Sequence, residues 1–125
     1  MEGAIHQKFV KTYQKSEVIF SENNFGKDMY IVYSGKVGLH TQGALGHKKL
    51  LAIVEAGDFF GEMALVDDSP RSATAIAEED NTQLLVLDKD KFTYLLRHQP
   101  NFGLAVMSKL CRQLREANRA ITGGR

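Results

Sequence analysis

The sequence is poor in the features that would support several common classes of function. Its 125 residues include one cysteine, Cys111, so an internal disulfide is excluded and a reducing compartment is favoured. Sixteen basic residues against fifteen acidic ones leave a net charge of +1, which provides no global field for nucleic acid or membranes. The longest apolar runs, such as 50–54, are far too short to span a bilayer, and no signal peptide is visible. We therefore expect a cytoplasmic protein without a membrane segment.

The residues that would support catalysis or metal binding are also scarce. The four histidines are dispersed, with no metal-ligand spacing and no HExxH-like pair. No G-x-x-x-x-G-K-[ST] motif is present, so nucleoside triphosphates are not implied. A metal-dependent enzyme on a related β-barrel would need clustered His and carboxylate side chains on strands, which the sequence lacks. We predict that the chain is not an enzyme and uses no metal or cofactor.

What is present is enough sequence for one domain with a β-rich middle. At 125 residues and 43% hydrophobic content, the chain can bury a core as a single soluble domain. Short β-branched or alternating runs with turn signals between them predict a mainly β fold, a jelly-roll barrel or sandwich. These runs cover residues 18–20, 29–33, 37–41, 49–54, 72–77 and 82–87.

Helical patterns flank this β region on both sides. Ile5, Phe9 and Tyr13 recur every fourth residue and predict an N-terminal helix within residues 1–16. After the barrel, 17–88, two helices separated by Pro100 are expected over 89–122. The last helix carries a sustained apolar stripe, which consists of Phe102, Val106, Leu110, Leu114, Ala117 and Ile121.

The stretch 57–74, GDFFGEMALVDDSPRSAT, breaks the β region with a short helix. Gly61 has no Cβ, so the backbone and a ligand can approach closely there. A helix that starts near Glu62 would present unpaired N–H groups to an anion, and the Glu62 carboxylate suits a sugar hydroxyl. Arg71 offers a forked guanidinium that matches two phosphate oxygens at once. The pattern indicates a cradle for a small phosphate-bearing ligand.

The letters FFGEMAL and PRSATA resemble the phosphate-binding cassette of the cyclic nucleotide-binding domains. These domains occur in cAMP-dependent kinase regulatory subunits, cyclic-nucleotide-gated channels and the catabolite activator protein. The resemblance covers nearly the whole chain and places the cassette at 60–73. In that family a Glu bonds the ribose 2′-hydroxyl and an Arg pairs with the cyclic phosphate; here Glu62 and Arg71 stand nine residues apart (71 − 62). Each residue alone also suits an ordinary role, such as an ion pair of Arg71 with Asp67 or Asp68, but their joint register favours the site.

The resemblance implies a regulatory domain that binds cAMP and signals its occupancy through movement of the C-terminal helix. Ser72 leans toward cAMP because similar sites selective for cGMP often have Thr there, and a cGMP-binding domain is the alternative. Ala64 and Ser72 would offer backbone N–H groups to the phosphate. The ligand-binding residues that the resemblance implies are Phe60, Gly61, Glu62, Met63, Ala64, Arg71, Ser72 and Ala73. Candidates to cap the base are Arg112, Arg115 and Asn118 on the last helix.

Other interpretations stay open beside this one. An interaction scaffold of the same fold that has lost its ligand is one, although the retention of Glu62 and Arg71 argues against it. A truncated sensor domain of a transcription regulator is another, and we expect no nucleic-acid binding by this chain alone. The last helix is also a candidate seam for a homodimer or an effector protein. Family members often carry Gly where Ser16 and Asn23 stand, and Asn tolerates positive φ.

Overall fold

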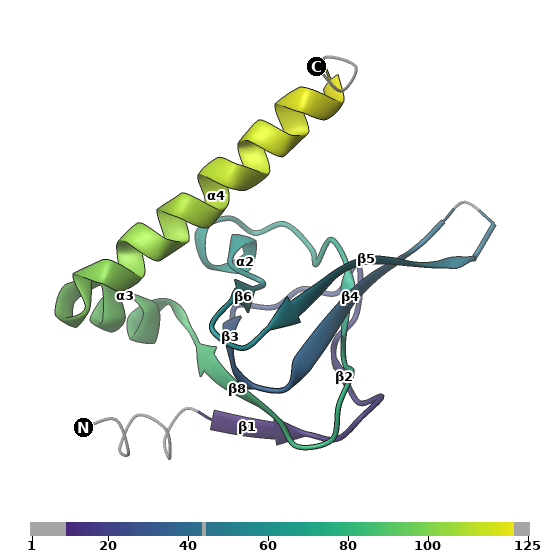
Figure 1. Ribbon diagram of the computed structural model, residues 1–125, viewed down its shortest axis with the longest axis horizontal. Helices are drawn as coiled ribbons and strands as arrows, with labels where there is room; N and C mark the ends of the chain where they lie inside the picture. The colour runs from purple at the N-terminus through teal and green to yellow at the C-terminus, as the bar shows by residue number, and fades with distance from the viewer. Residues whose placement is uncertain (1–9, 44, 122–125) are drawn as a thin grey trace. The chain divides into compact units, whose positions relative to one another are not determined.

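A computed structural model of the chain describes residues 10–43 and 45–121. Contacts between residues divide the chain into two compact units, Met1–Lys89 and Asp90–Arg125. None of the described helices is long and apolar enough to cross a membrane. In chain order the elements are β1 (Val10–Tyr13), β2 (Val18–Phe20), β3 (Met29–Ser34), β4 (Lys36–Gln42), β5 (Lys48–Glu55), β6 (Phe59–Phe60), α2 (Met63–Val66), β7 (Thr74–Ala77), β8 (Thr82–Leu87), α3 (Lys89–His98) and α4 (Pro100–Ile121) (Figure 1).

The strands of the first unit form two four-stranded antiparallel sheets. One sheet has the order β1-β8-β3-β6 and the other the order β2-β7-β4-β5, so most neighbours are distant in sequence. The predicted mainly β fold is therefore confirmed, and each predicted strand is present within a few residues of its expected bounds. Two strands were not predicted, β6 and β1. β6 has only two residues, too few to show an alternating pattern.

The hydrophobic core of this unit draws on both sheets. In β4, Val37 is fully buried and Leu39 packs against the core, while His40 lies on the opposite face, as strand alternation requires. The buried cluster consists of Tyr30, Val32, Phe60 and Leu84 from the first sheet, and Val37, Val54 and Ala75 from the second. Because Phe60 ends β6 inside this cluster, the core holds the chain firmly just before Gly61.

The predicted N-terminal helix is wrong where the structure describes the chain. Val10–Tyr13 is a strand that pairs antiparallel with β8, in the register Val10↔Leu85 and Tyr13↔Thr82. β-branched and aromatic residues fit this pairing, which brings together segments far apart in the sequence. Residues 1–9, which carry the rest of the proposed helical stripe, lie outside the described residues. The chain then turns at Ser16, which has a φ of 77°, in the left-handed region that favours glycine.

The second unit contains the helices α3 and α4. The break at Gln99 and Pro100 matches the predicted interruption, and α4 runs for 22 residues to Ile121. Phe92 of α3 meets Phe102 of α4 edge to face, with ring centroids 5.7 Å apart. A Cβ on Gly103 would lie 3.0 Å from the side chain of Leu96, so α3 and α4 pack closely at this point.

Candidate anion-binding site

The segment that carries the predicted ligand-binding residues leaves the core at β6 and returns to it at β7. Between them, Gly61 adopts a φ of 78°, a left-handed conformation that residues with a Cβ rarely adopt. Helix α2 follows and ends at Val66, and the Ser69 amide donates to Asp67 Oδ1 at 3.1 Å in the turn beyond. The predicted short helix and turn are confirmed. The strand after them begins at Thr74, two residues later than expected.

Arg71 is the most buried charged side chain of this segment, with 6% of its surface exposed. Its Nη2 donates to the backbone carbonyl of Asp28 at 2.9 Å, and its Nη1 donates to that of Gly61 at 3.3 Å. Its main chain is also held, because the Arg71 amide donates to the Asn24 carbonyl at 2.7 Å and the Arg71 carbonyl accepts from the Asn23 amide at 2.8 Å. Loop 21–28 therefore holds both the backbone and the guanidinium of Arg71.

An aromatic cluster lies beneath the guanidinium. Arg71 Cζ lies 4.1 Å from the centre of the Phe20 ring and 5.9 Å from that of Tyr30. Tyr30 in turn stacks on Phe60, with ring centroids 5.2 Å apart. Such cation–π contacts favour a guanidinium by roughly 0.5–2 kcal/mol, the larger value when it is desolvated. They do not neutralise its charge.

The charge of Arg71 lacks a carboxylate partner among the described residues. No ion pair joins Arg71 to an acidic side chain there, so the alternative of a pair with Asp67 or Asp68 is wrong for this structure. Nε is buried and has no hydrogen-bond partner. Burial lowers the pKa of the Arg71 guanidinium, and the nearby Tyr30 and Asp28 oppose that shift. A buried cation whose hydrogen bonds go only to neutral acceptors is chemically suited to an anion.

The other predicted ligand-binding residues differ in their surroundings. Glu62 is half-buried and directly precedes α2, so the short helix starts where the sequence predicted. The Ala64 amide donates to the Gly61 carbonyl at 3.3 Å, while Ser72 is exposed. Phe60 is a core residue with 2% of its surface exposed, so its side chain supports the site through packing. The remaining two are Met63, which is exposed, and Ala73, which is buried.

The three candidates to cap the base lie in the second unit. Arg112, Arg115 and Asn118 are exposed residues of α4. Their proposed role in covering a base stays a prediction, since it concerns how α4 meets the first unit.

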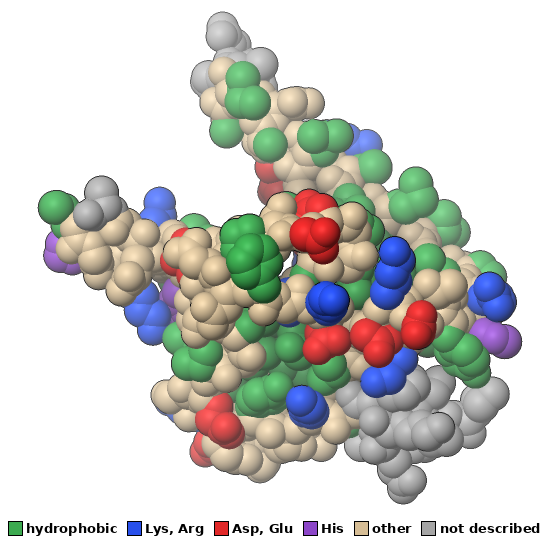
Figure 2. All heavy atoms as spheres, turned by 180° about the vertical axis from the view of Figure 1, so that it is seen from behind, with side chains coloured by type: hydrophobic (Ala, Val, Ile, Leu, Met, Phe, Trp, Pro, Cys, Tyr) green, Lys and Arg blue, Asp and Glu red, His purple; other side chains and the backbone are tan. Residues whose placement is uncertain are grey.

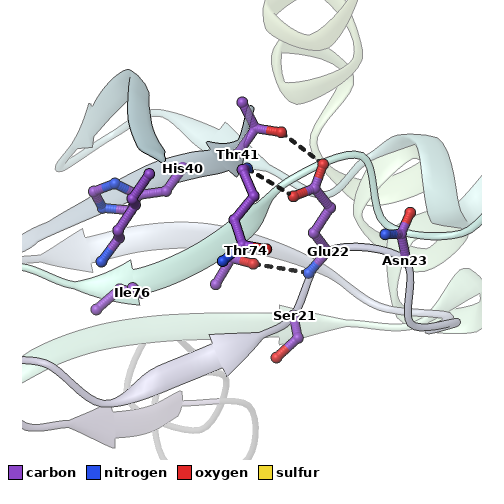
Figure 3. A pocket seen from close by; sticks show the side chains of 9 residues that line it. Ser21, Glu22, Asn23, His40, Thr41, Thr74 and Ile76 are labelled. Carbon is purple, nitrogen blue, oxygen red and sulfur yellow. Dashed lines mark hydrogen bonds between the residues drawn. The ribbon is translucent and has the colours of Figure 1, made fainter. Parts of the chain in front are cut away.

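A separate hollow of about 350 Å³ lies on the outer face of the second sheet (Figure 3). His40 and Thr74 are cross-strand partners there, on the face opposite the core residues Leu39 and Ala75. The Glu22 carboxylate accepts hydrogen bonds from Thr41 Oγ1 at 2.6 Å and from the Gln42 amide at 3.1 Å. The Arg71 site is therefore distinct from this hollow.

Comparison with known proteins identifies the family of the chain. The family described as "Cyclic nucleotide-binding domain" matches residues 10–99. The chain is 38% identical over 108 residues to the "Cyclic AMP receptor protein" of Thermus thermophilus, covering 86% of this chain and 50% of that protein. It is 39% identical over 85 residues to "cGMP-dependent protein kinase 2" of Homo sapiens, covering 66% of this chain and 11% of that protein. The crystal structure of the Thermus thermophilus catabolite activator protein has a TM-score of 0.83 and 34% identity, and covers 97% of this chain and 57% of that one.

This chain belongs to the cyclic nucleotide-binding domain family, and its two sheets and flanking helices have the jelly-roll fold of that family. It spans about half the length of the Thermus thermophilus relative and much less of the kinase. Membership of this family supports a cyclic nucleotide as the ligand class, while the individual ligand-binding residues stay predictions. Sequence reasoning missed loop 21–28, because the Arg71–Asp28 contact joins residues 43 positions apart.

Proposed function

We propose that the domain is a cytoplasmic cAMP receptor in which Arg71 binds the cyclic phosphate. The observation that supports this is the buried guanidinium, which meets only neutral carbonyl oxygens and has an unpaired Nε. A phosphate anion would supply the missing negative charge and accept from the guanidinium at more than one oxygen. Glu62, on the same segment, would accept a hydrogen bond from the ribose 2′-hydroxyl.

The choice of base is the finer part of the proposal. Relatives are named for both nucleotides, a "Cyclic AMP receptor protein" and a "cGMP-dependent protein kinase 2". Ser72 favours cAMP, since sites selective for cGMP often have Thr at this place. A Ser72→Thr variant should therefore bind cGMP more tightly, which would reduce the difference in affinity between cAMP and cGMP.

Calorimetry with cAMP, cGMP and AMP tests the proposal directly. We expect cAMP to bind more tightly than cGMP, and AMP to bind weakly because its phosphate is not cyclic. Equal affinity for AMP and cAMP would contradict a site built for the cyclic phosphate, and preference for cGMP would assign the alternative ligand. Recovery of unchanged cAMP after incubation with Mg²⁺, Mn²⁺ or Zn²⁺ would support a receptor role, whereas repeated turnover to AMP would refute it.

Occupancy is proposed to be signalled through α4. Several apolar side chains of this helix are exposed in the structure, which Figure 2 shows as hydrophobic groups along the helix that ends at the grey C-terminal residues. They are Leu104, Met107, Leu110, Leu114 and Ile121. Exposed apolar residues spaced three, three, four and seven positions apart fall on one side of a helix and are suited to a partner surface. We propose that this set of exposed residues, which includes Leu110, Leu114 and Ile121 of the predicted stripe, is covered when the ligand binds, either within the domain or in a homodimer or effector complex.

A further inference from the structure

The loop between β2 and β3 contains a glycine that touches the functional cation. A Cβ built on Gly26 would lie 2.5 Å from Arg71 Nη2, 2.8 Å from Nε and 2.9 Å from Cζ. Real Cβ atoms essentially never approach a heavy atom more closely than 3.0 Å. We propose that Gly26 is a positioning residue for Arg71, whose guanidinium occupies the space that any other side chain at position 26 would fill.

The three atoms nearest to this Cβ position all belong to the guanidinium and none to the backbone. Gly26 is also not among the glycines with positive φ, so its backbone conformation is open to alanine. A substitution at Gly26 therefore leaves the course of the chain intact. What it changes is the place of the guanidinium.

The guanidinium has little room to yield without losing its contacts. The Phe20 ring covers it at 4.1 Å, and a Cβ on Gly61 would lie 3.0 Å from Nη1. A shift away from Gly26 lengthens the 2.9 Å hydrogen bond from Nη2 to the Asp28 carbonyl. Gly26, Gly61 and Phe20 together surround the guanidinium of Arg71 and fix its position.

The position of this contact matters for a ligand. The two atoms closest to the Gly26 Cβ position are Nη2 and Nε, the edge of the fork that can meet two oxygens of one anion. Nε is the buried polar atom without a partner. A side chain at position 26 would displace the Nε–Nη2 edge of the guanidinium and would also block an anion from reaching it. This consequence rests on the proposed function, whereas the contact itself does not.

The contact is tested first without any ligand, by a double-mutant cycle in chemical denaturation. Gly26→Ala should lower the unfolding midpoint of the wild type, because the new methyl group displaces the Arg71 guanidinium from its contacts with Phe20 and the Asp28 carbonyl. In an Arg71→Ala background the same change should be neutral or stabilising, since the opposing atoms are gone and the unfolded chain loses freedom. An equal loss of stability in both backgrounds would overturn the proposal. It would also be overturned if neither Gly26→Ala nor the double variant folded.

Ligand binding provides the second arm, with cAMP as the probe. Gly26→Ala should weaken cAMP binding by at least about tenfold, the equivalent of one lost charge-assisted hydrogen bond. Gly43→Ala is the matched control, because its Cβ would lie 3.6 Å from the nearest atom, the His47 carbonyl, and its φ is not positive. Unchanged affinity in Gly26→Ala would overturn the positioning role. If the wild type bound no cyclic nucleotide, the proposed function would fail, while the ligand-free cycle would still decide the contact.

Discussion

Replacement of Arg71 by methionine separates a functional arginine from a structural one. The side chain is 6% exposed and has no acidic partner among the described residues. Methionine keeps a flexible apolar stem of similar length in the same space. We expect the variant to lose the ligand and yet keep nearly the stability of the unliganded wild type.

The expected stability change follows from the contacts that are removed and the costs that are relieved. Arg71→Met loses hydrogen bonds to the carbonyls of Asp28 and Gly61, about 1.5 kcal/mol each for a charged donor, and a cation–π contact with Phe20 of about 1–2 kcal/mol. It relieves the desolvation of the cation, several kcal/mol, a cost that includes the unpaired Nε. These opposing terms cancel to within about 2 kcal/mol. A structural ion pair broken in the same way would cost about 3–5 kcal/mol.

Ligand affinity should respond much more strongly. Loss of the charged partner of a buried phosphate typically costs about 2–5 kcal/mol, or roughly 30-fold to several thousandfold in the dissociation constant. At a cAMP concentration 100 times its Kd, the wild type gains about 2.7 kcal/mol of stability. A variant with 100-fold weaker affinity gains only about 0.4 kcal/mol at the same concentration.

Chemical denaturation of Arg71→Met and the wild type, each with and without cAMP, measures both quantities in one experiment. A loss of more than about 4 kcal/mol without ligand would show that Arg71 is structural and refute the reasoning. Retention of the full ligand-induced gain would refute the assignment of Arg71 to the phosphate. Arg71→Lys, which keeps the charge and loses the fork, should recover only part of the affinity.

Three further predictions concern the sugar, a buried tyrosine and the last helix. Glu62→Gln should weaken cAMP binding by about 1–3 kcal/mol in calorimetry and leave binding of 2′-deoxy-cAMP unchanged, because that ligand lacks the hydroxyl; equal losses for both would contradict the role. Burial, with Tyr13 and Asp28 nearby, raises the pKa of Tyr30 from 10.0 to about 12 in the folded protein. The contribution of the neutral Tyr30 side chain to folding stability is therefore complete below pH 10, and it is lost as pH rises toward 12 because the unfolded chain ionises first. Between pH 10 and 12, the free energy of unfolding of the wild type should therefore fall by up to about 1.4 kcal/mol per pH unit relative to that of Tyr30→Phe. If the two proteins lost stability with pH in parallel, the effect would be ruled out. Hydrogen exchange with cAMP should slow at residues 61–73 and also at 110–121, and a chain truncated after residue 108 should bind more weakly; a response confined to 61–73 with unchanged affinity would disprove the role of α4.

The sequence by itself was sufficient for features that depend on neighbouring residues. The turn beyond α2 is a local pattern and appears in the structure as expected. The alternation predicted for 37–41 holds only as far as Leu39, because the pairing register shifts between Leu39 and His40, and Thr41 then lines the same hollow as His40. The positive φ of Asn23 agrees with the tolerance expected for that residue. Spacing within one short segment pointed to a cyclic nucleotide-binding domain, and the family match over residues 10–99 confirms that family. The roles of Glu62 and Arg71 in binding the ligand stay predictions.

Tertiary structure decided what depends on partners far along the chain. Val10–Tyr13 has a helical pattern only as part of a stripe that starts at Ile5, whereas pairing with β8, about 70 residues later, makes it a strand. The surroundings of Arg71 come from three separate segments, since Phe20, Gly26 and the Asp28 carbonyl meet it across the chain. No pattern along the sequence reports which carbonyl a guanidinium will reach or which glycine leaves it room. Those contacts exist only because the two sheets close over one core and bring loop 21–28 against the segment that follows β6.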